Sequence, residues 1–318
     1  MKSKCSEILD YVGWLKSQVI GQDELVESMV ITLLTDANLL IEGMPGLAKT
    51  HTVKSFSRGL GLLMNRVQFT PDLLPSDITG TEVYQPDGEN PFIFNQGPVF
   101  CNILLADEIN RAPAKVQSAL LEAMEEKQVT VGGKSYNLSD PFMVFATQNP
   151  IEQEGTFPLP EAQTDRFLMK AIVSYTSKSQ ERVIVEKIRM HAFKESQYNL
   201  SKEVIDDAKV SVDKMHVDEN ITDYMIRLVD ATRNIADYDS SMESWIRYGA
   251  SPRGSIALDA ASRAVAFLNG RDYVTPDDVR QVVHRVLRHR IMLTYKALAK
   301  RITTDSVIDK LLASVLIN

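Results

Sequence analysis

A glycine-bearing loop near the start of the chain carries the residue types of a phosphate site. The run Gly43-Met44-Pro45-Gly46-Leu47-Ala48-Lys49-Thr50 follows an apolar segment, residues 39–41, and precedes a segment of helical pattern, residues 51–58. Between a strand and a helix, such a loop binds phosphate through backbone N–H groups, its lysine reaches the β- and γ-phosphates, and its threonine hydroxyl ligates Mg²⁺. Ala48 replaces the glycine of the strict pattern, at little expected cost if it lies in the first helical turn. We assign to nucleotide binding Gly43, Pro45, Gly46, Leu47, Ala48, Lys49, Thr50 and His51, with Thr50 also a Mg²⁺ ligand.

Two adjacent acids follow a second apolar segment, residues 102–106. If this segment is a buried strand, Asp107 and Glu108 lie at the carboxyl edge of the sheet, where ligands bind in open α/β folds. Asp107 is then the expected Mg²⁺ ligand, usually through water, and Glu108 the group that orients the attacking water. An acidic strand end without function is the alternative, and the phosphate loop upstream argues against it.

Asn149 and Arg166 extend the candidate catalytic set. Asn149 follows an apolar segment, residues 142–147, and its amide is placed to hydrogen-bond the attacking water or the γ-phosphate; the alternative is a residue that shapes the turn before Pro150. Arg166 ends a short helical segment, and an arginine there can reach the nucleotide of a neighbouring subunit as an arginine finger. The alternative is a surface arginine paired with Asp165 or Glu161. Arg111 is a weaker candidate for a contact in trans.

Two further segments are candidates for nucleotide contacts. Val19-Ile20-Gly21 joins two amphipathic helical patterns just before the phosphate loop, so that its apolar pair can lie against an adenine ring; ordinary packing at a helix junction is the alternative. Arg253 begins a later helix and can fold back onto the γ-phosphate. The predicted catalytic residues are therefore Lys49, Glu108, Asn149, Arg166 and Arg253.

The elements that must position these residues indicate two domains. Residues 1–175 contain the apolar strand patterns, which predict a parallel sheet between helices. Residues 70–100, rich in Pro, Gly and Asp, predict an inserted element or lid, with a passive surface loop as the alternative. Residues 128–136 predict a hairpin around Gly132-Gly133. From residue 176 to 318 strand patterns stop and helical patterns continue to the end, which predicts an all-helical domain. Basic residues between 284 and 301 favour a solvated helix face over a nucleic-acid site.

The composition limits the class of protein. The 318 residues are 44% hydrophobic and 24% charged, as in a globular protein, and the net charge of −7 argues against a protein that mainly grips nucleic-acid backbone. Cys5 and Cys101, the two cysteines, lack metal-ligand spacing. The N-terminus has no signal-peptide pattern, and no apolar run approaches the roughly 20 residues of a membrane span. We expect a cytoplasmic protein without a membrane span.

Five blocks, taken together and in order, are similar to the motifs of the MoxR family of AAA+ ATPases: residues 42–50, 106–113, 146–152, 159–167 and 249–253. Alanine before the lysine is normal in that family. The resemblance implies a five-stranded parallel αβα P-loop NTPase core followed by a smaller all-α lid domain, with nucleotide between the two. It assigns Lys49 and Thr50 to Walker A, Asp107 and Glu108 to Walker B, Asn149 to sensor 1, Arg166 to the trans finger and Arg253 to sensor 2.

The resemblance also implies an activity and partners. We expect Mg²⁺-dependent ATP hydrolysis by a ring oligomer, usually a hexamer, acting as a chaperone that remodels or activates protein clients, among them a von Willebrand factor A-domain protein. Residues 70–100 then correspond to the helix-2 insert and the hairpin near Gly132 to the pre-sensor insertion. The alternatives are a nucleic-acid motor or loader, which the acidic balance disfavours, and a scaffold that binds ATP without turning it over.

Overall fold

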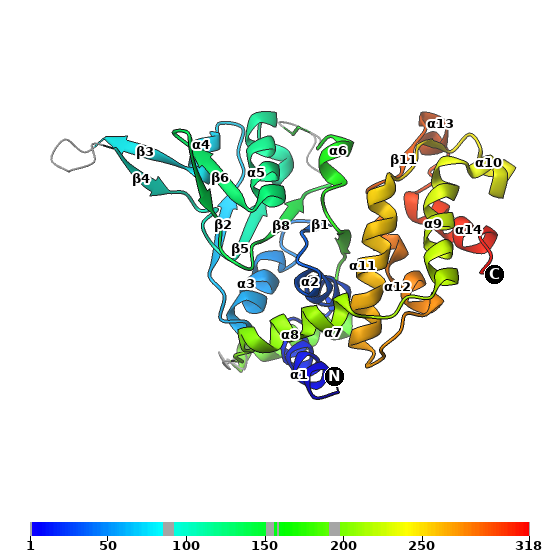
Figure 1. Ribbon diagram of the computed structural model, residues 1–318, viewed down its shortest axis with the longest axis horizontal. Helices are drawn as coiled ribbons and strands as arrows, with labels where there is room; N and C mark the ends of the chain where they lie inside the picture. Colours follow the sequence, from blue (N-terminus) through cyan, green and yellow to red (C-terminus); the bar gives the residue numbers. More distant parts are fainter. Residues whose placement is uncertain (1, 85–91, 151–155, 158, 191–197, 318) are drawn as a thin grey trace.

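A five-stranded parallel sheet forms the centre of the N-terminal half in the computed structural model, which describes residues 2–84, 92–150, 156–157, 159–190 and 198–317 (Figure 1). Neighbouring strands pair in parallel in the order β2-β5-β8-β1-β9. The strands are β1 (Leu39–Gly43), β2 (Met64–Gln68), β5 (Ile103–Asp107), β8 (Met143–Gln148) and β9 (Met169–Val173). The predicted parallel sheet is confirmed.

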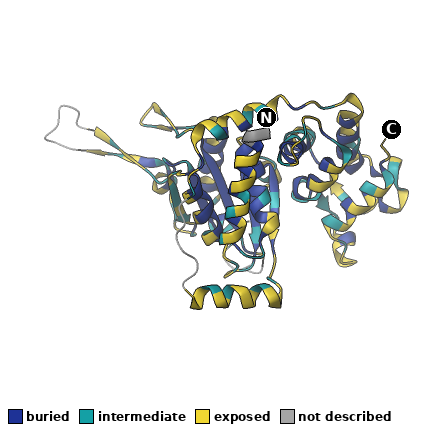
Figure 2. Ribbon diagram, turned by 90° about the horizontal axis from the view of Figure 1, so that it is seen from below, coloured by how far each residue is buried: buried dark blue, intermediate teal, exposed yellow. Residues whose placement is uncertain are grey.

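Helices cover both faces of this sheet. Along each central strand successive side chains point to opposite faces, so Leu39 and Ile41 of β1 join one apolar cluster and Leu40 joins the other. Both clusters are buried, which explains why these strands appear in sequence as continuous apolar runs. Helices α1 (Lys2–Gln18), α2 (Asp23–Leu34) and α3 (Lys49–Gly59) pack on the first face, and α5 (Ala114–Glu126) packs on the second. Figure 2 shows the strands as the buried centre of the domain.

The second half of the chain is helical, as predicted, with one addition. A short antiparallel ribbon of β10 (Ile246–Tyr248) and β11 (Met292–Leu293) joins two of its loops. The helices are α7 (Lys178–Arg189), α8 (Lys202–Asp213), α9 (Glu219–Arg233), α10 (Ile235–Tyr238), α11 (Pro252–Leu268), α12 (Pro276–Leu287), α13 (Tyr295–Ala299) and α14 (Thr304–Ser314). Across the residues that the structure describes, no helix has the length and apolar character needed to cross a membrane.

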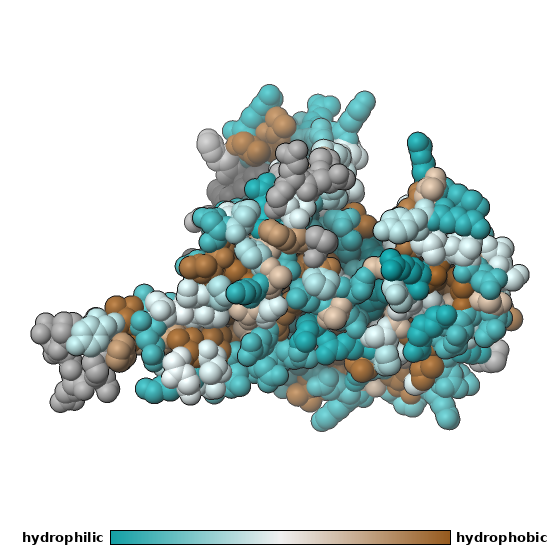
Figure 3. All heavy atoms as spheres, turned by 90° about the horizontal axis from the view of Figure 1, so that it is seen from above, coloured by the Kyte–Doolittle hydropathy of each residue, from teal (hydrophilic) through white to brown (hydrophobic). Residues whose placement is uncertain are grey.

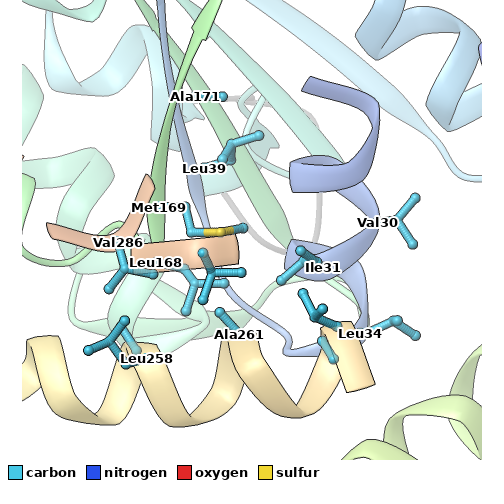
Figure 4. Packing of buried hydrophobic residues seen from close by; sticks show 14 of the residues in the cluster. Val30, Ile31, Leu34, Leu39, Leu168, Met169, Ala171, Leu258, Ala261 and Val286 are labelled. Atoms are coloured by element: carbon cyan, nitrogen blue, oxygen red, sulfur yellow. The ribbon is translucent and has the colours of Figure 1, made fainter. Parts of the chain in front are cut away.

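One apolar cluster connects the sheet with the helical half. Figure 4 shows Ile31 of α2, Leu39 of β1 and Met169 of β9 packed with Leu258 of α11 and Val286 of α12. Helix α8 contacts both α1 and α11, so it belongs to neither side alone. The domain boundary near residue 176 therefore stays a prediction.

Two ribbons project from the sheet on the side away from the helical half (Figure 1). The segment 70–100 contains α4 (Pro75–Thr79), β3 (Gly80–Tyr84) and β4 (Phe92–Gln96), and the predicted hairpin is β6 (Gln128–Val131) with β7 (Lys134–Asn137). Phe94 stacks on Tyr136 with ring centroids 4.1 Å apart, so the two ribbons contact each other. Apolar side chains are exposed toward the end of the β3–β4 ribbon (Figure 3), including Tyr84 and Phe92.

The arginines between residues 284 and 290 do not form the solvated face that was expected. Arg285 is buried and pairs with Glu27 at 2.9 Å, and Arg288 pairs with Asp305 at 3.1 Å. Arg290 pairs with an acid of the sheet domain, as described next. The acids come from elements distant in sequence, which is why the local pattern suggested solvent.

Arg290 joins the helical half to the sheet. Its guanidinium lies 2.7 Å from Asp165 and donates to the carbonyls of Phe167 (2.7 Å) and Leu168 (3.0 Å). The Arg290 side chain is 2% exposed; burial lowers its pKa, and the Asp165 carboxylate opposes this shift. Removing one partner of such a pair leaves the other charge buried without its counter-ion.

We expect Arg290→Met to lower the free energy of unfolding by about 3–5 kcal/mol, the usual cost of breaking a buried ion pair. Urea unfolding followed by circular dichroism measures it. The matched control is Arg182→Met, because Arg182 pairs with Glu186 while 82% exposed; its loss is expected to stay below about 1 kcal/mol. Equal losses for the two variants would contradict the role given to Arg290.

Candidate functional site

The phosphate loop runs from the end of β1 to the start of α3. Gly46 has φ +82° and Ala48 has φ +55°, so both residues are in the left-handed region. Ala48 is the N-cap of α3 rather than a residue of its first turn, which corrects the expectation from sequence; the loop holds an alanine in a conformation that favours glycine. Within the described chain no side chain caps this helix end. Its first N–H groups therefore remain suited to an anion.

Gly43 and Lys49 are fixed by their surroundings. A Cβ on Gly43 would lie 2.8 Å from the carbonyl oxygen of Val173, so the neighbouring strand β9 requires glycine there. The Lys49 ammonium is buried and donates to the carbonyl oxygen of Gly43 at 2.6 Å. Burial lowers the pKa of Lys49, and Asp107, Glu108 and Glu42 raise it. Three carboxylates thus stabilise the charged lysine that a phosphate site needs.

The acids after β5 are held by Thr147, which lies near the end of β8. The Thr147 hydroxyl donates to Asp107 Oδ1 at 2.5 Å and accepts from the backbone N–H of Glu108 at 2.9 Å. Glu108 has φ +58° and is thereby in the left-handed region, a strained conformation for a residue with a Cβ. Glu108 is the N-cap of the short turn Ile109–Arg111, while Asp107 remains buried at the strand end.

Two residues of β2 also contact these acids and were not identified from sequence. Arg66 donates to Asp107 Oδ2 through Nε (3.0 Å) and Nη2 (2.7 Å), and Gln68 donates to Glu108 Oε2 at 2.8 Å. Arg111 lies 3.0 Å from the same Glu108 oxygen, so it contacts the Glu108 of its own chain. Residues 66 and 68 are two apart on a strand that pairs with β5, and this spacing was the available signal.

The order of the strands brings three of the predicted catalytic residues, Lys49, Glu108 and Asn149, to one edge of the sheet. Strand β8 lies between β5, which ends at Asp107, and β1, which leads to the phosphate loop. Asn149 comes directly after β8 and therefore lies between these two parts of the site. Asn149 is buried and lines a cavity of about 590 Å³ with Glu42 and Asn110. Residues 151 and 152 of the sequence block around Asn149 lie outside the described residues.

An apolar cavity of about 360 Å³ adjoins the phosphate loop. Val19 and Ile20 line it, as predicted for the base, together with Gly46, Leu47, Ala48 and His51 of the loop region. Gly21 does not line the cavity; it has φ +77°, and a Cβ there would lie 2.7 Å from Thr176. The other lining residues were not predicted from the sequence. They are Gln18 and Gln22, next to the predicted pair, and Thr176, Ile184 and Ile188.

Arg166 and Arg253 lie together, at a different place from Lys49. Both form ion pairs with Glu125 of α5: Arg253 at 2.8 Å, and Arg166 through the other carboxylate oxygen. Within the described chain neither arginine contacts the phosphate loop, Asp107 or Glu108. Asp165 and Glu161, the partners named in the alternative interpretation of Arg166, are not the ones observed. The role of Arg253 toward the nucleotide of its own subunit stays a prediction.

The donor set at the sheet edge fits Mg²⁺. Mg²⁺ prefers oxygen ligands and keeps several waters, so it needs only one or two protein groups. Thr50 lines a cavity of about 470 Å³ together with Arg66, the residue that contacts Asp107. Asp107 Oδ1 accepts one hydrogen bond, from Thr147, and so retains a lone pair for a metal-bound water, whereas Oδ2 accepts two from Arg66. Thr50 and Asp107 are therefore the residues that would hold the ion.

Comparisons with known proteins show the family of the chain. A model of the ATPase family associated with various cellular activities (AAA) matches residues 38–169, and an AAA lid domain model matches residues 240–311. The chain is 46% identical to Chaperone MoxR1 of Mycobacterium tuberculosis (strain ATCC 25618 / H37Rv) over 302 residues, 95% of this chain and 80% of that protein. It is 33% identical to Protein MoxR of Paracoccus denitrificans, over 88% of this chain and 87% of that one.

A solved structure supports the same grouping. The crystal structure of a candidate ATPase from Cytophaga hutchinsonii ATCC 33406 has a TM-score of 0.90 and 44% sequence identity, covering 99% of this chain and 95% of that chain. Sequence similarity thus extends over nearly the whole chain, through the sheet and the helical half alike. The chain belongs to the MoxR family of AAA ATPases.

Proposed function

We propose that the chain hydrolyses ATP with Mg²⁺ at the edge of the sheet, in a ring of identical subunits. The observation that carries this proposal is the joint placement of Lys49 with Asp107 and Glu108. The charges of both acids act on the buried ammonium, and Thr147 fixes both acids in turn. A site that only bound nucleotide would need the lysine but not a second, separately oriented carboxylate.

The mechanism follows from the position of each group. Glu108, directed by its left-handed turn and held by Gln68 and Arg111, orients the water that attacks the γ-phosphate, and Asn149 is the second group for that water. Lys49 and the N–H groups at the start of α3 offset the negative charge of the phosphates. Mg²⁺, held by Thr50 and Asp107, would neutralise further charge on the phosphate oxygens. The apolar cavity beside Val19 and Ile20 accepts the adenine base.

The biological role is the remodelling of protein partners. Chaperone MoxR1 is a chaperone by its name, and this chain shares 46% of the aligned residues with it. The proposal also includes assembly into a ring and a cytoplasmic location. Its partners are protein clients, among them a von Willebrand factor A-domain protein. Exposed apolar residues on the β3–β4 ribbon offer a surface for a client chain.

Phosphate release from ATP tests the activity. We expect steady release with Mg²⁺ and loss of nearly all release in excess EDTA, because without the cation the Asp107 carboxylate places a negative charge beside the negative phosphates. Adding back Mg²⁺ restores release and excludes damage by the chelator. No release with Mg²⁺ would contradict the proposal. Strong stimulation by DNA with a steep dependence on salt would instead favour a nucleic-acid motor.

A further inference from the structure

Glu125 joins two arginines from different parts of the fold. Arg166 precedes β9 in the sheet domain, and Arg253 lies in the first turn of α11 in the helical half. One oxygen of the Glu125 carboxylate pairs with Arg253 at 2.8 Å, and the other pairs with Arg166. One carboxylate therefore sets the separation of two guanidinium groups that are 87 positions apart in sequence.

A second set of contacts fixes the same two segments. Ser251, the N-cap of α11, donates to Asp165 Oδ2 at 2.6 Å, and Arg290 lies 2.7 Å from Asp165 Oδ1. Asp165 precedes Arg166, and Ser251 is two residues before Arg253. The backbone at both arginines is thus anchored, and Glu125 determines where the long side chains point.

The contribution of Glu125 to stability does not explain its position. Glu125 lies in the last turn of α5, where the helix dipole disfavours a negative charge. The side chains are 40% exposed for Glu125, 32% for Arg166 and 47% for Arg253, and ion pairs this exposed contribute about 0–1 kcal/mol. What the arrangement does provide is geometry and charge. Two arginines and one carboxylate leave one net positive charge, with guanidinium N–H groups still available to a phosphate.

We propose that Glu125 is a positioning residue that holds Arg166 and Arg253 as one cationic pair for the triphosphate bound by an adjacent copy of this chain. The inference depends on the ATPase function proposed above. It goes further, because it names a residue, Glu125, that touches no reacting atom. It also assigns Arg253, together with Arg166, to the nucleotide of the neighbouring subunit rather than to the nucleotide bound by Lys49 of its own subunit. Within the described chain, the observed contacts of both arginines lead to Glu125 and not to their own phosphate loop.

Kinetics of Glu125→Gln test the positioning role. We expect kcat for ATP to fall by about 10- to 100-fold, the cost of small misplacements of catalytic groups, with KM within about threefold of wild type. Glu125→Asp is expected to recover part of the loss. The matched control, Glu126→Gln, changes an exposed carboxylate one position along the same helix and is expected to keep kcat within about twofold. Unchanged or raised kcat for Glu125→Gln, or a change confined to KM, would overturn the proposal.

Mixed assemblies test whether the effect acts on a neighbour. Glu108→Gln subunits have an inactive site of their own but an intact arginine pair. When they are mixed with Glu125→Gln or with Arg253→Ala subunits, we expect turnover per subunit with an intact Glu108 to rise. If either mixture shows no recovery, the proposal that the two arginines act together on a neighbouring subunit is wrong. Wild-type phosphate release separates the two proposals: no release contradicts the ATPase function, whereas release with a fully active Glu125→Gln contradicts the positioning role alone.

Discussion

Glu108→Gln is expected to lower steady-state ATP turnover by about three orders of magnitude, the scale of loss when a group that acts only in the transition state is removed. ATP binding is expected to change less than about threefold, because Lys49, the loop and the base cavity are untouched. Glutamine has nearly the same shape and still meets Gln68, but it lacks the charge that orients water. Phosphate release measures turnover, and equilibrium titration with a fluorescent ATP analogue measures binding.

The choice of glutamine isolates the charge. Glu108 is in the left-handed region with φ +58°, and glutamine experiences the same backbone strain, so a loss of activity cannot come from a change in that strain. Glu126→Gln again serves as the charge-matched control. Normal turnover by Glu108→Gln would show that another group orients the water.

The sheet was predictable from sequence because burial on both faces makes its central strands apolar throughout. Their parallel pairing then places the ends of β5 and β8 at the same edge as the phosphate loop, so Asp107, Glu108 and Asn149 followed from pattern alone. The β10–β11 ribbon did not, because strands of three and two residues are too short to show a periodicity. Ala48 was misjudged for a different reason: its conformation is imposed by the loop around it.

The contacts of the residues that support the site depend on the fold, and the sequence held only a weak spacing signal for Arg66 and Gln68. Arg66 and Gln68 alternate on an edge strand, a pattern typical of solvent exposure, and their contact with the two acids exists only because β2 pairs with β5. Ile184 and Ile188 have the spacing of an ordinary helix face. Glu125 is one of three acids near the end of α5, and only the fold shows which of them meets Arg166 and Arg253. The predicted catalytic residues lie in local sequence motifs, whereas the residues that hold them in place make contacts that only the fold creates.

Arg166→Ala is expected to reduce turnover by about 10³-fold, the lower range for loss of an arginine finger, with little change in ATP affinity of the same subunit. The reason is spatial: Arg166 pairs with Glu125 at the surface and makes no contact with its own Lys49 or Glu108 in the described structure. Its charge is available to a phosphate held by another subunit. Phosphate release and analogue titration of the purified variant measure the two quantities.

A mixing experiment distinguishes this role from simple damage to the fold. Glu108→Gln subunits carry an intact Arg166, so adding them to Arg166→Ala is expected to restore part of the turnover, although each variant alone is nearly inactive. Arg182→Ala, a change at an exposed arginine on α7, controls for the loss of a surface charge and is expected to remain active without mixing. If the two inactive variants stay inactive together while both still assemble, Arg166 acts within its own subunit, because an intact finger next to an intact site would then have no effect.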